Sequence, residues 1–177
     1  MPGPCRPGRT YARLMDAPFR LRLATPDDAE ACGAVHHRSW VETYSHLLPP
    51  EHWRTDTVER RAALWTRVLR DGFEVPVAEV DGRIVGLALA VPGRTIGAHG
   101  PVRDRELSTL YVLAEHHGTG AGQALLDTAL PPGTPAQLWV LDDNPRARRF
   151  YERNGFTPDG ARHLDEGLGF TELRYIR

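Results

Sequence analysis

Three glycines alternate in Gly118-Thr-Gly120-Ala-Gly122, where the pattern predicts that a β-strand passes into a helix. Glycine lets the backbone turn sharply and come close to a ligand, so successive N–H groups can face one point. The first turn of a helix adds further unpaired N–H groups and a partial positive charge. Such a cradle can hold a phosphate with little side-chain charge, which matters because residues 110–123 contain histidines but no arginine.

Two other phosphate-binding turns fit this segment less well. A P-loop requires Lys-Ser or Lys-Thr after its last glycine, but Gln123-Ala124 follows here. A dinucleotide-binding G-x-G-x-x-G turn also fails, because Gln123 or Leu125 stands where the third glycine belongs. Alternating glycines alone also fit a plain tight connection between a strand and a helix. The rest of the chain has to decide between these alternatives.

The remaining sequence predicts a mixed α/β sheet in a single domain. Phe19–Ala24 alternates apolar and basic residues, as a half-buried strand does, and Asp81-Gly82 is a strong signal for a β-hairpin. Thr25 and Asn144 are each followed by proline, which marks two helix starts. The predicted strands are 19–24, 74–80, 83–91, 106–113, 137–141, a short one from 156, and 170–176. The predicted helices run from 25 toward Trp40 and Tyr44, over 57–69, from 118 to 129 or 130, and from 144 to a stop at 154–155. Neither an internal repeat nor a linker between domains is evident in this order.

Composition excludes several classes of function. The formal net charge of -1 gives no whole-protein attraction to nucleic acid or to a membrane. All 22 basic residues are arginine, which excludes a lysine nucleophile or Schiff base. Cys5 and Cys32 form no metal-binding pair, the histidines show no compact metal signature, and no apolar run approaches the ~20 residues that span a bilayer. We therefore expect a cytoplasmic protein with no metal, and with neither nucleic acid nor a membrane as a partner.

The N-terminal segment is expected to lie outside the folded domain. Residues 1–18 contain proline, glycine and arginine but no apolar h-region, so they do not have the pattern of a secretory signal. We expect a disordered extension over 1–18, with Met15 as an alternative start, and a folded domain over 19–177.

Two segments, His117–Gly122 and 139–156, resemble motifs of the GNAT N-acetyltransferases. The first is similar to the acyl-CoA-binding motif Q/R-x-x-G-x-G/A, and the second to N-x-x-A-x-x-F-Y-x-x-x-G-F, in the family's order and spacing. The resemblance covers nearly all of the chain from Phe19. It implies a single-domain GNAT-like α/β fold, with a mixed, mostly antiparallel seven-stranded sheet flanked by about four helices. His117 replaces the usual Gln or Arg, and Thr119 stands where a basic residue is common, so the motif brings less charge to a pyrophosphate.

The resemblance implies acetyl-CoA as the acyl donor, with its pantetheine arm between two strands that part. Backbone groups of 110–112 would bond the pantetheine amides, and the amides of 118–123 would hold the pyrophosphate. Asn144 sits where family members often place a side chain against the cofactor, and a plain helix N-cap is an equal and compatible role. The cofactor-binding residues implied in this way are Leu110, Tyr111, Val112, His117, Gly118, Thr119, Gly120, Ala121, Gly122, Gln123 and Asn144.

Tyr151 is the catalytic acid that the resemblance implies. Attack of an amine on a thioester releases a thiolate with a reference pKa of about 8.5, which a phenol can protonate. Family members commonly use the tyrosine at this place for that step. The alternative is that Phe150 and Tyr151 are core aromatics, because Ala147 lies on the same helical face.

Glu106 is the catalytic base that the resemblance implies. It stands at the start of a predicted strand and corresponds to a carboxylate that relatives often use as a base, usually through water. The alternatives are a surface acid at a strand end or a partner for Arg103 or Arg105.

The resemblance implies an acceptor pocket built from the first two helices, the loop between them and the last hairpin. The segment 40–53 is rich in aromatic residues, with carboxylates and histidines among them, which suits a cationic amine through cation–π and charge contacts. Trp40 and Tyr44 are the predicted acceptor-binding residues, with a core-packing helix and a polar loop as the alternative. Further candidates for the rim of the site are His163, Asp165 and Glu166.

The predicted function is transfer of an acetyl or other short acyl group from acyl-CoA to a primary amine by direct attack. The acceptor is expected to be a small-molecule amine or a protein N-terminus. One alternative is a non-catalytic acyl-CoA sensor or regulatory module, which would keep the glycine cradle but could lose the acid or base. Another is a scaffold protein that keeps only the fold. A homodimer is the default expectation, because closed two-fold dimers are the commonest oligomers.

Overall fold

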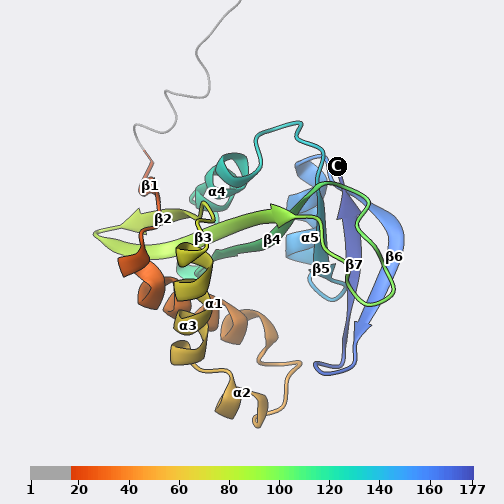
Figure 1. The fold of residues 1–177 in the computed structure, drawn as a ribbon, viewed down its shortest axis with the longest axis horizontal. Helices are drawn as coiled ribbons and strands as arrows, with labels where there is room; N and C mark the ends of the chain where they lie inside the picture. Colours follow the sequence, from red (N-terminus) through yellow and green to blue (C-terminus); the bar gives the residue numbers. More distant parts are fainter. Residues whose placement is uncertain (1–16) are drawn as a thin grey trace, which may run out of the picture.

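The computed structural model describes residues 17–177, which form one seven-stranded sheet with helices on both faces (Figure 1). The strand order is β1-β2-β3-β4-β5-β7-β6. The strands are β1 Arg20–Leu23, β2 Pro76–Val80, β3 Arg83–Pro92, β4 Arg105–Val112, β5 Gln137–Leu141, β6 Thr157–Asp165 and β7 Phe170–Ile176. The α-helices are α1 Ala29–Tyr44, α2 His52–Thr55, α3 Val58–Arg70, α4 Ala121–Ala129 and α5 Pro145–Arg153. Residues 1–16, which include Cys5, Met15 and nearly all of the predicted extension, lie outside the described residues.

The first four strands form an antiparallel sheet whose pairing begins with a tight hairpin. Asp81-Gly82 joins β2 to β3, and the two residues have φ angles of +49° and +74°. Two-residue hairpin turns of the type I′ class need positive φ at both positions, which aspartate and glycine tolerate. The predicted hairpin is therefore confirmed. Strand β1 pairs with the other edge of β2, where Arg22 and Glu79 form an ion pair (Nε–Oε2 2.8 Å).

Strands β4 and β5 are parallel neighbours over only two residue pairs. Glu106 pairs with Gln137 and Leu107 pairs with Leu138, and the pairing ends there. Ser108 is an extra residue in β4, because its two neighbours pair with consecutive residues of β3. A bulge of this kind bends the strand and increases its twist. The second half of β4 therefore has no strand partner on the side of β5.

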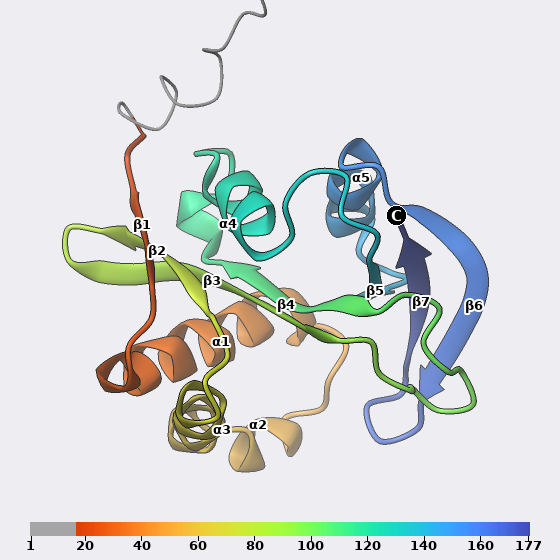
Figure 2. The ribbon, with the colours of Figure 1, turned by 45° about the horizontal axis from the view of Figure 1, so that its top comes forward.

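Helices cover the two faces of the sheet unequally. Figure 2 shows α1, α2 and α3 on one face and α4 and α5 on the other. One cluster of buried side chains joins α1 and α3 to β2 and β3 and includes Cys32, Trp65 and Leu87, while another joins α4 to the C-terminal strands and includes Leu126 and Leu138. The free thiol of Cys32 is fully buried, and this burial raises its pKa to about 12. None of the helices in residues 17–177 is long and apolar enough to cross a membrane.

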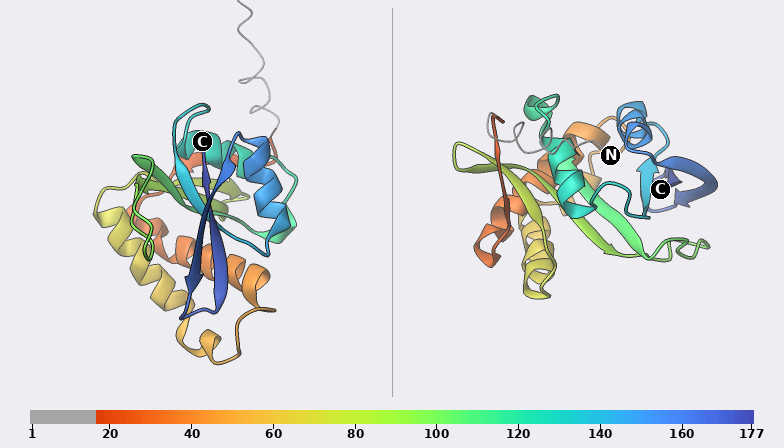
Figure 3. Two further views of the ribbon diagram at one scale, coloured as in Figure 1. Left: turned by 90° about the vertical axis from the view of Figure 1, so that its right-hand side faces the viewer. Right: turned by 90° about the horizontal axis from the view of Figure 1, so that it is seen from above.

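The C-terminal strands form the other half of the sheet. Strands β5, β7 and β6 are antiparallel, and β6 and β7 make a hairpin at one end of the molecule that reaches toward the segment after α1 (Figure 3). The aromatic rings of Tyr44, the last residue of α1, and Phe170, the first residue of β7, stack with centroids 5.4 Å apart. This contact ties the hairpin to the helical layer.

Three details differ from the sequence prediction, although the order of strands and main helices is confirmed. Residues 17–177 contain five α-helices rather than four, because α2 is a single turn too short to show a helical period. Helix α4 begins at Ala121 rather than 118, because positive φ angles at Gly118 and Gly120 are incompatible with a helix. Strand β6 is nine residues long rather than short, because it pairs with β7. Thr25 caps a single 3₁₀ turn that leads into α1.

We expect Gly33 to be essential for the close approach of α1 and α3. A Cβ at this position would lie 2.5 Å from the backbone nitrogen of Ala62 and 2.7 Å from its Cα. Because backbone atoms cannot rotate aside, Gly33→Ala should push the helices apart and lower the free energy of unfolding by about 1–3 kcal/mol. Ala34→Ser, on the exposed side of α1, is the control and should change it by about 0.5 kcal/mol or less. Urea unfolding followed by circular dichroism measures both, and parental stability of Gly33→Ala would contradict this packing.

Candidate active site

A cavity of about 870 Å³ opens where β4 and β5 separate. Its walls come from α1, β4, the glycine turn, β5, α5 and the β6–β7 hairpin. A shallower hollow of about 460 Å³ shares Leu141 and Phe170 with it. The cavity brings together all of the predicted site residues except Glu106, Thr119 and Ala121.

The glycine turn presents a group of free amides to this cavity. Gly118 and Gly120 have φ angles of +79° and +93°, and Gly120 is the N-cap of α4. Within residues 17–177, no hydrogen bond uses the backbone N–H groups of 118–120, 122 or 123. Unpaired N–H groups that converge at a helix start favour an anion. The turn therefore fits a pyrophosphate group, as the glycine pattern predicts.

Thr119 and Ala121 shape this turn. The Thr119 hydroxyl donates to the His116 carbonyl oxygen at 2.8 Å. The Thr119 hydroxyl oxygen in turn accepts weakly from the Ala121 N–H, at 3.4 Å. Neither residue lines the cavity, so their contribution in this structure is to hold the neighbouring amides in place.

Arg146 supplies the positive charge that the turn itself lacks. His117 Nε2 lies 2.8 Å from the Val112 carbonyl oxygen, to which it donates, and His117 Nδ1 accepts from Arg146 at 2.8 Å. With one donor and one acceptor nitrogen, the His117 ring is neutral. Sequence reasoning missed Arg146, which lies in the first turn of α5. The signal that could have found it is the parallel pairing of β4 and β5, because it places the starts of α4 and α5 at one edge of the sheet.

Asn144 both caps α5 and lines the cavity. Its Oδ1 accepts from the Ala147 N–H at 3.0 Å, which confirms the predicted N-cap. Contact between the remaining amide group and a cofactor stays a prediction. Bonding of the pantetheine amides by the backbone of residues 110–112 also stays a prediction. These residues lie on the edge of β4 that lacks a strand partner.

Tyr151 projects from α5 and lines the cavity. Its ring also packs edge-to-face against Phe156, with centroids 6.0 Å apart, so it belongs to the core as well. Burial raises the pKa of Tyr151, with a smaller upward effect from Tyr111 and an opposing one from Arg146. The phenol therefore holds its proton at neutral pH and can act as an acid.

Glu106 lies outside the cavity lining and is only 1% exposed. Its oxygens accept from the Arg94 guanidinium (Nε 2.8 Å), from the Arg94 backbone N–H (3.1 Å) and from Gln137 Nε2 (2.8 Å). It is thus not a surface acid, and its cationic partner is Arg94 rather than Arg103 or Arg105. Its role as a base stays a prediction, although these donors occupy its lone pairs.

Trp40 and Tyr44 form an aromatic wall of the cavity together with Phe170. The rings of Trp40 and Tyr44 lie 4.7 Å apart, and Tyr44 stacks on Phe170. The Trp40 indole N–H donates to the Tyr111 hydroxyl at 2.7 Å, which fixes the indole against β4. Sequence reasoning missed Phe170, because its contact with Tyr44 joins the two ends of the domain.

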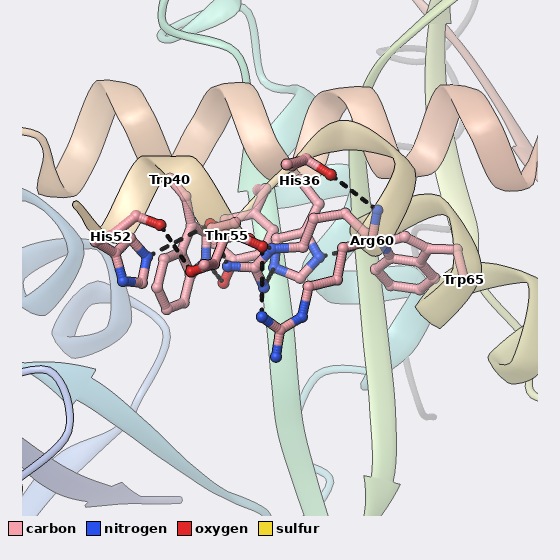
Figure 4. A network of polar contacts seen from close by, with 10 residues as sticks. His36, Trp40, His52, Thr55, Arg60 and Trp65 are labelled. Carbon is pink, nitrogen blue, oxygen red and sulfur yellow. Dashed lines mark hydrogen bonds and ion pairs between the residues drawn. The ribbon is translucent and has the colours of Figure 1, made fainter. Parts of the chain in front are cut away.

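A buried polar network behind Trp40 supports this wall (Figure 4). His36 Nδ1 accepts from the Trp65 indole N–H at 3.1 Å, and His36 Nε2 lies 2.9 Å from the Arg61 guanidinium. Arg61 pairs with the buried Asp56 (2.6 Å) and lies 4.3 Å from the centre of the Trp40 ring. Burial and the nearby Arg61 lower the pKa of His36 to about 3, so its ring is neutral. The predicted acceptor segment therefore serves as both core and cavity wall.

Glu172 on β7 is a cavity carboxylate that sequence reasoning missed. Burial raises its pKa, while His163, its pairing neighbour on β6, acts in the opposite direction. Asp165 from the same hairpin lines the cavity, but His163 and Glu166 do not. Within residues 17–177, no group of three His, Cys, Asp or Glu side chains is arranged to hold a metal ion.

The chain matches known acetyltransferases in sequence and in fold. The model of the acetyltransferase (GNAT) family matches residues 35–156. An uncharacterized N-acetyltransferase of Mycobacterium tuberculosis (strain H37Rv) is 34% identical over 142 residues, which cover 76% of this chain and 86% of that protein. The PaiA N-acetyltransferase of Thermoplasma acidophilum, solved with coenzyme A, aligns with a TM-score of 0.59 and 20% identity over 88% of this chain and 97% of that one. YncA of Salmonella typhimurium, solved with acetyl-CoA, aligns with a TM-score of 0.64 and 18% identity over 90% and 92%. The chain therefore belongs to the acetyltransferase (GNAT) family of acetyl-CoA-dependent N-acetyltransferases.

Proposed function

We propose that the protein transfers an acetyl or other short acyl group to a primary amine, on a small molecule or at a protein N-terminus. One observation carries this proposal: a single cavity joins the amide cradle at 118–123 to the half-buried phenol of Tyr151. Acetyl-CoA supplies the acyl group in activated form, as a thioester. A module that only senses CoA needs the cradle but has no use for an acid farther along the cavity.

Two features of the chain fit the shape and charge of acetyl-CoA. The free amides of the glycine turn, with Arg146 beside them, suit the pyrophosphate. The edge of β4 over 110–112 has no strand partner and offers backbone groups to the pantetheine amides, as a neighbouring strand would, with the Val112 carbonyl oxygen already bonded to His117. Both contacts use main-chain groups, so they tolerate the departure from the family motif at His117.

Tyr151 serves as the acid in this proposal. The amine nitrogen attacks the carbonyl carbon, the carbon–nitrogen bond forms, the carbon–sulfur bond breaks, and the phenol gives its proton to the departing sulfur. A thiolate that forms in the same desolvated cavity also has a pKa above its reference value of about 8.5. The burial that raises the pKa of Tyr151 therefore does not prevent the transfer.

Thiol release from acetyl-CoA across a panel of amines tests the proposed activity, with the thermal shift produced by CoA measured alongside. We expect CoA to stabilise the protein and thiol release to occur with certain amines only. CoA binding without release on a broad panel would favour a non-catalytic sensor. Failure to bind CoA at millimolar concentration would leave only a scaffold with this fold.

Tyr151→Phe is expected to lower turnover at least about tenfold, because the acid is lost, while the dissociation constant for CoA changes little. Tyr175→Phe is the control, because it removes a buried phenol that bonds Arg148 and Glu152 outside the cavity. Single-turnover thiol release measures the chemical step in both variants. Unaltered release by Tyr151→Phe, with chemistry rate-limiting, would remove this phenol from the mechanism.

Gly120→Ala is expected to weaken CoA binding at least about tenfold, because a side chain at φ +93° costs about 1–2 kcal/mol and the relaxed turn would no longer converge its amides. Gly133→Ala is the matched control, since Gly133 has φ +82°, open space around it and no place in the cavity. Titration calorimetry with CoA gives both affinities. Equal losses in the two variants would show that the effect comes from lower stability and not from the cradle.

A further inference from the structure

Charges of opposite sign reach the cavity from different elements. Its two arginines, Arg146 and Arg153, both come from α5, and Arg146 contacts the glycine turn. Its carboxylates come from α1 and from the β6–β7 hairpin, and they are Glu42, Asp165 and Glu172. Within the described residues, no arginine from α1, β4 or the hairpin lines the cavity. The cradle side therefore suits an anion, and the hairpin side suits a cation.

Glu172 has free acceptor capacity on the hairpin side. Its carboxylate makes no hydrogen bond or ion pair with residues 17–177, whereas Glu42 already accepts from Arg38 (3.0 Å) and from the Ala114 N–H (3.0 Å). Glu106 is occupied by its donors from Arg94 and Gln137. A partly buried carboxylate without a partner is costly, and a bound cation would remove that cost.

Aromatic rings stand beside this carboxylate. Phe170 and Glu172 are two residues apart on β7, so their side chains lie on the same face of the sheet. Tyr44 stacks on Phe170 with an angle of 14° between the rings, and Trp40 contacts Tyr44 in turn. All four side chains line the cavity. Aromatic faces next to a carboxylate attract an ammonium group and a flat apolar skeleton attached to it.

We propose that the acceptor is a primary ammonium carried on an aromatic skeleton, without an acidic group beside the nitrogen, and that Glu172 binds this ammonium and removes its proton. The inference rests on the proposed acyl transfer. It excludes amino acids as good acceptors, because their carboxylate would lie next to Glu172 with no arginine from the hairpin to bind it.

The proton balance of this step assigns one role to each side chain. The Glu172 carboxylate takes a proton from the ammonium nitrogen, whose lone pair then attacks the thioester carbon. As the carbon–sulfur bond breaks, Tyr151 gives its proton to sulfur. The new amide nitrogen loses its second proton, which restores the Tyr151 phenol through water, and Glu172 releases its proton to solvent. The net products are an amide, a thiol and one proton.

The environment of Glu172 determines the expected pH dependence. The ionisable groups that act on it or feel its charge are His163, Asp165, Arg94, Glu106, Tyr44 and Tyr111. Burial is the largest effect and raises the pKa of Glu172. The Glu172 carboxylate therefore becomes protonated at a higher pH than an ordinary glutamate does. The kcat/KM of the enzyme should therefore fall on the acid side in that range.

Three amines test the acceptor class with the intact protein. 2-Phenylethylamine should be acetylated with a kcat/KM at least about tenfold above that of propylamine, which lacks the ring. It should exceed L-phenylalanine, which adds a carboxylate beside the nitrogen, by a larger factor. Comparable values for 2-phenylethylamine and either of the other two amines would overturn the proposed class.

Three variants test the base with 2-phenylethylamine as acceptor. Glu172→Gln should lower kcat/KM by about 10²-fold or more and remove the acid limb of the pH profile, while Glu172→Asp keeps the limb. Glu79→Gln is the matched control, a half-buried glutamate on β2 that does not line the cavity, and should keep both the rate and the acid limb. If Glu106→Gln loses the limb and Glu172→Gln keeps it, the inference is wrong.

The CoA titrations separate failure of this inference from failure of the proposed function. Parental CoA affinity of Glu172→Gln would show that its cavity is intact and that the lost rate belongs to the acceptor step. Thiol release that favours propylamine or L-phenylalanine would overturn the inference but leave acyl transfer standing. CoA binding with no release on the full amine panel would overturn both.

Discussion

Strands β4 and β5 hydrogen-bond over two residue pairs and then separate, which leaves backbone groups of β4 without partners in the sheet. Buried N–H and C=O groups need partners, so a gap of this kind persists only where water or a ligand can fill it. The cavity of about 870 Å³ occupies that gap. The glycine turn, α5 and β7 all border it because they follow or pair with these two strands. The site therefore lies where the strand pairing of the sheet is interrupted.

Strands β4 and β5 begin to separate at a defined point because the side chains of Glu106 and Gln137 bond the two strands together just before it. The side-chain Nε2 of Gln137 donates to Glu106 across the first paired residues, and its side-chain Oε1 accepts from the backbone N–H groups of Val102 (2.8 Å) and Arg103 (3.2 Å). Arg94 closes the network from the loop after β3. These contacts pin the loop 93–104 to the base of the opening, and the extra residue Ser108 then turns β4 away. A buried polar network with every member bonded can fix such a geometry.

Local patterns predicted most of the fold, since alternation, turn residues and helix caps depend on neighbouring residues. The grouping of the cradle, Asn144, Tyr151 and the aromatic segment of α1 into one site came from the resemblance to the family motifs, and all of them border the cavity. What they missed depends on residues far apart in the chain. Arg146 contacts His117 because two parallel strands align two helix starts, and Phe170, two residues before Glu172, stacks on Tyr44 because the last hairpin folds back over α1. Neither arrangement leaves a periodic signal in the sequence.

The two glutamates show why residue type and position do not by themselves identify a base. Glu106 on β4 and Glu172 on β7 are both strand residues, Glu106 fully buried and Glu172 partly buried. Glu106 meets four donors, from Arg94 and Gln137, so a proton that reached it would have to displace bonds that hold the fold together. Glu172 meets none within the described residues, and its burial favours the protonated form. A carboxylate that can gain a proton without breaking the structure is better suited to accept one from a substrate.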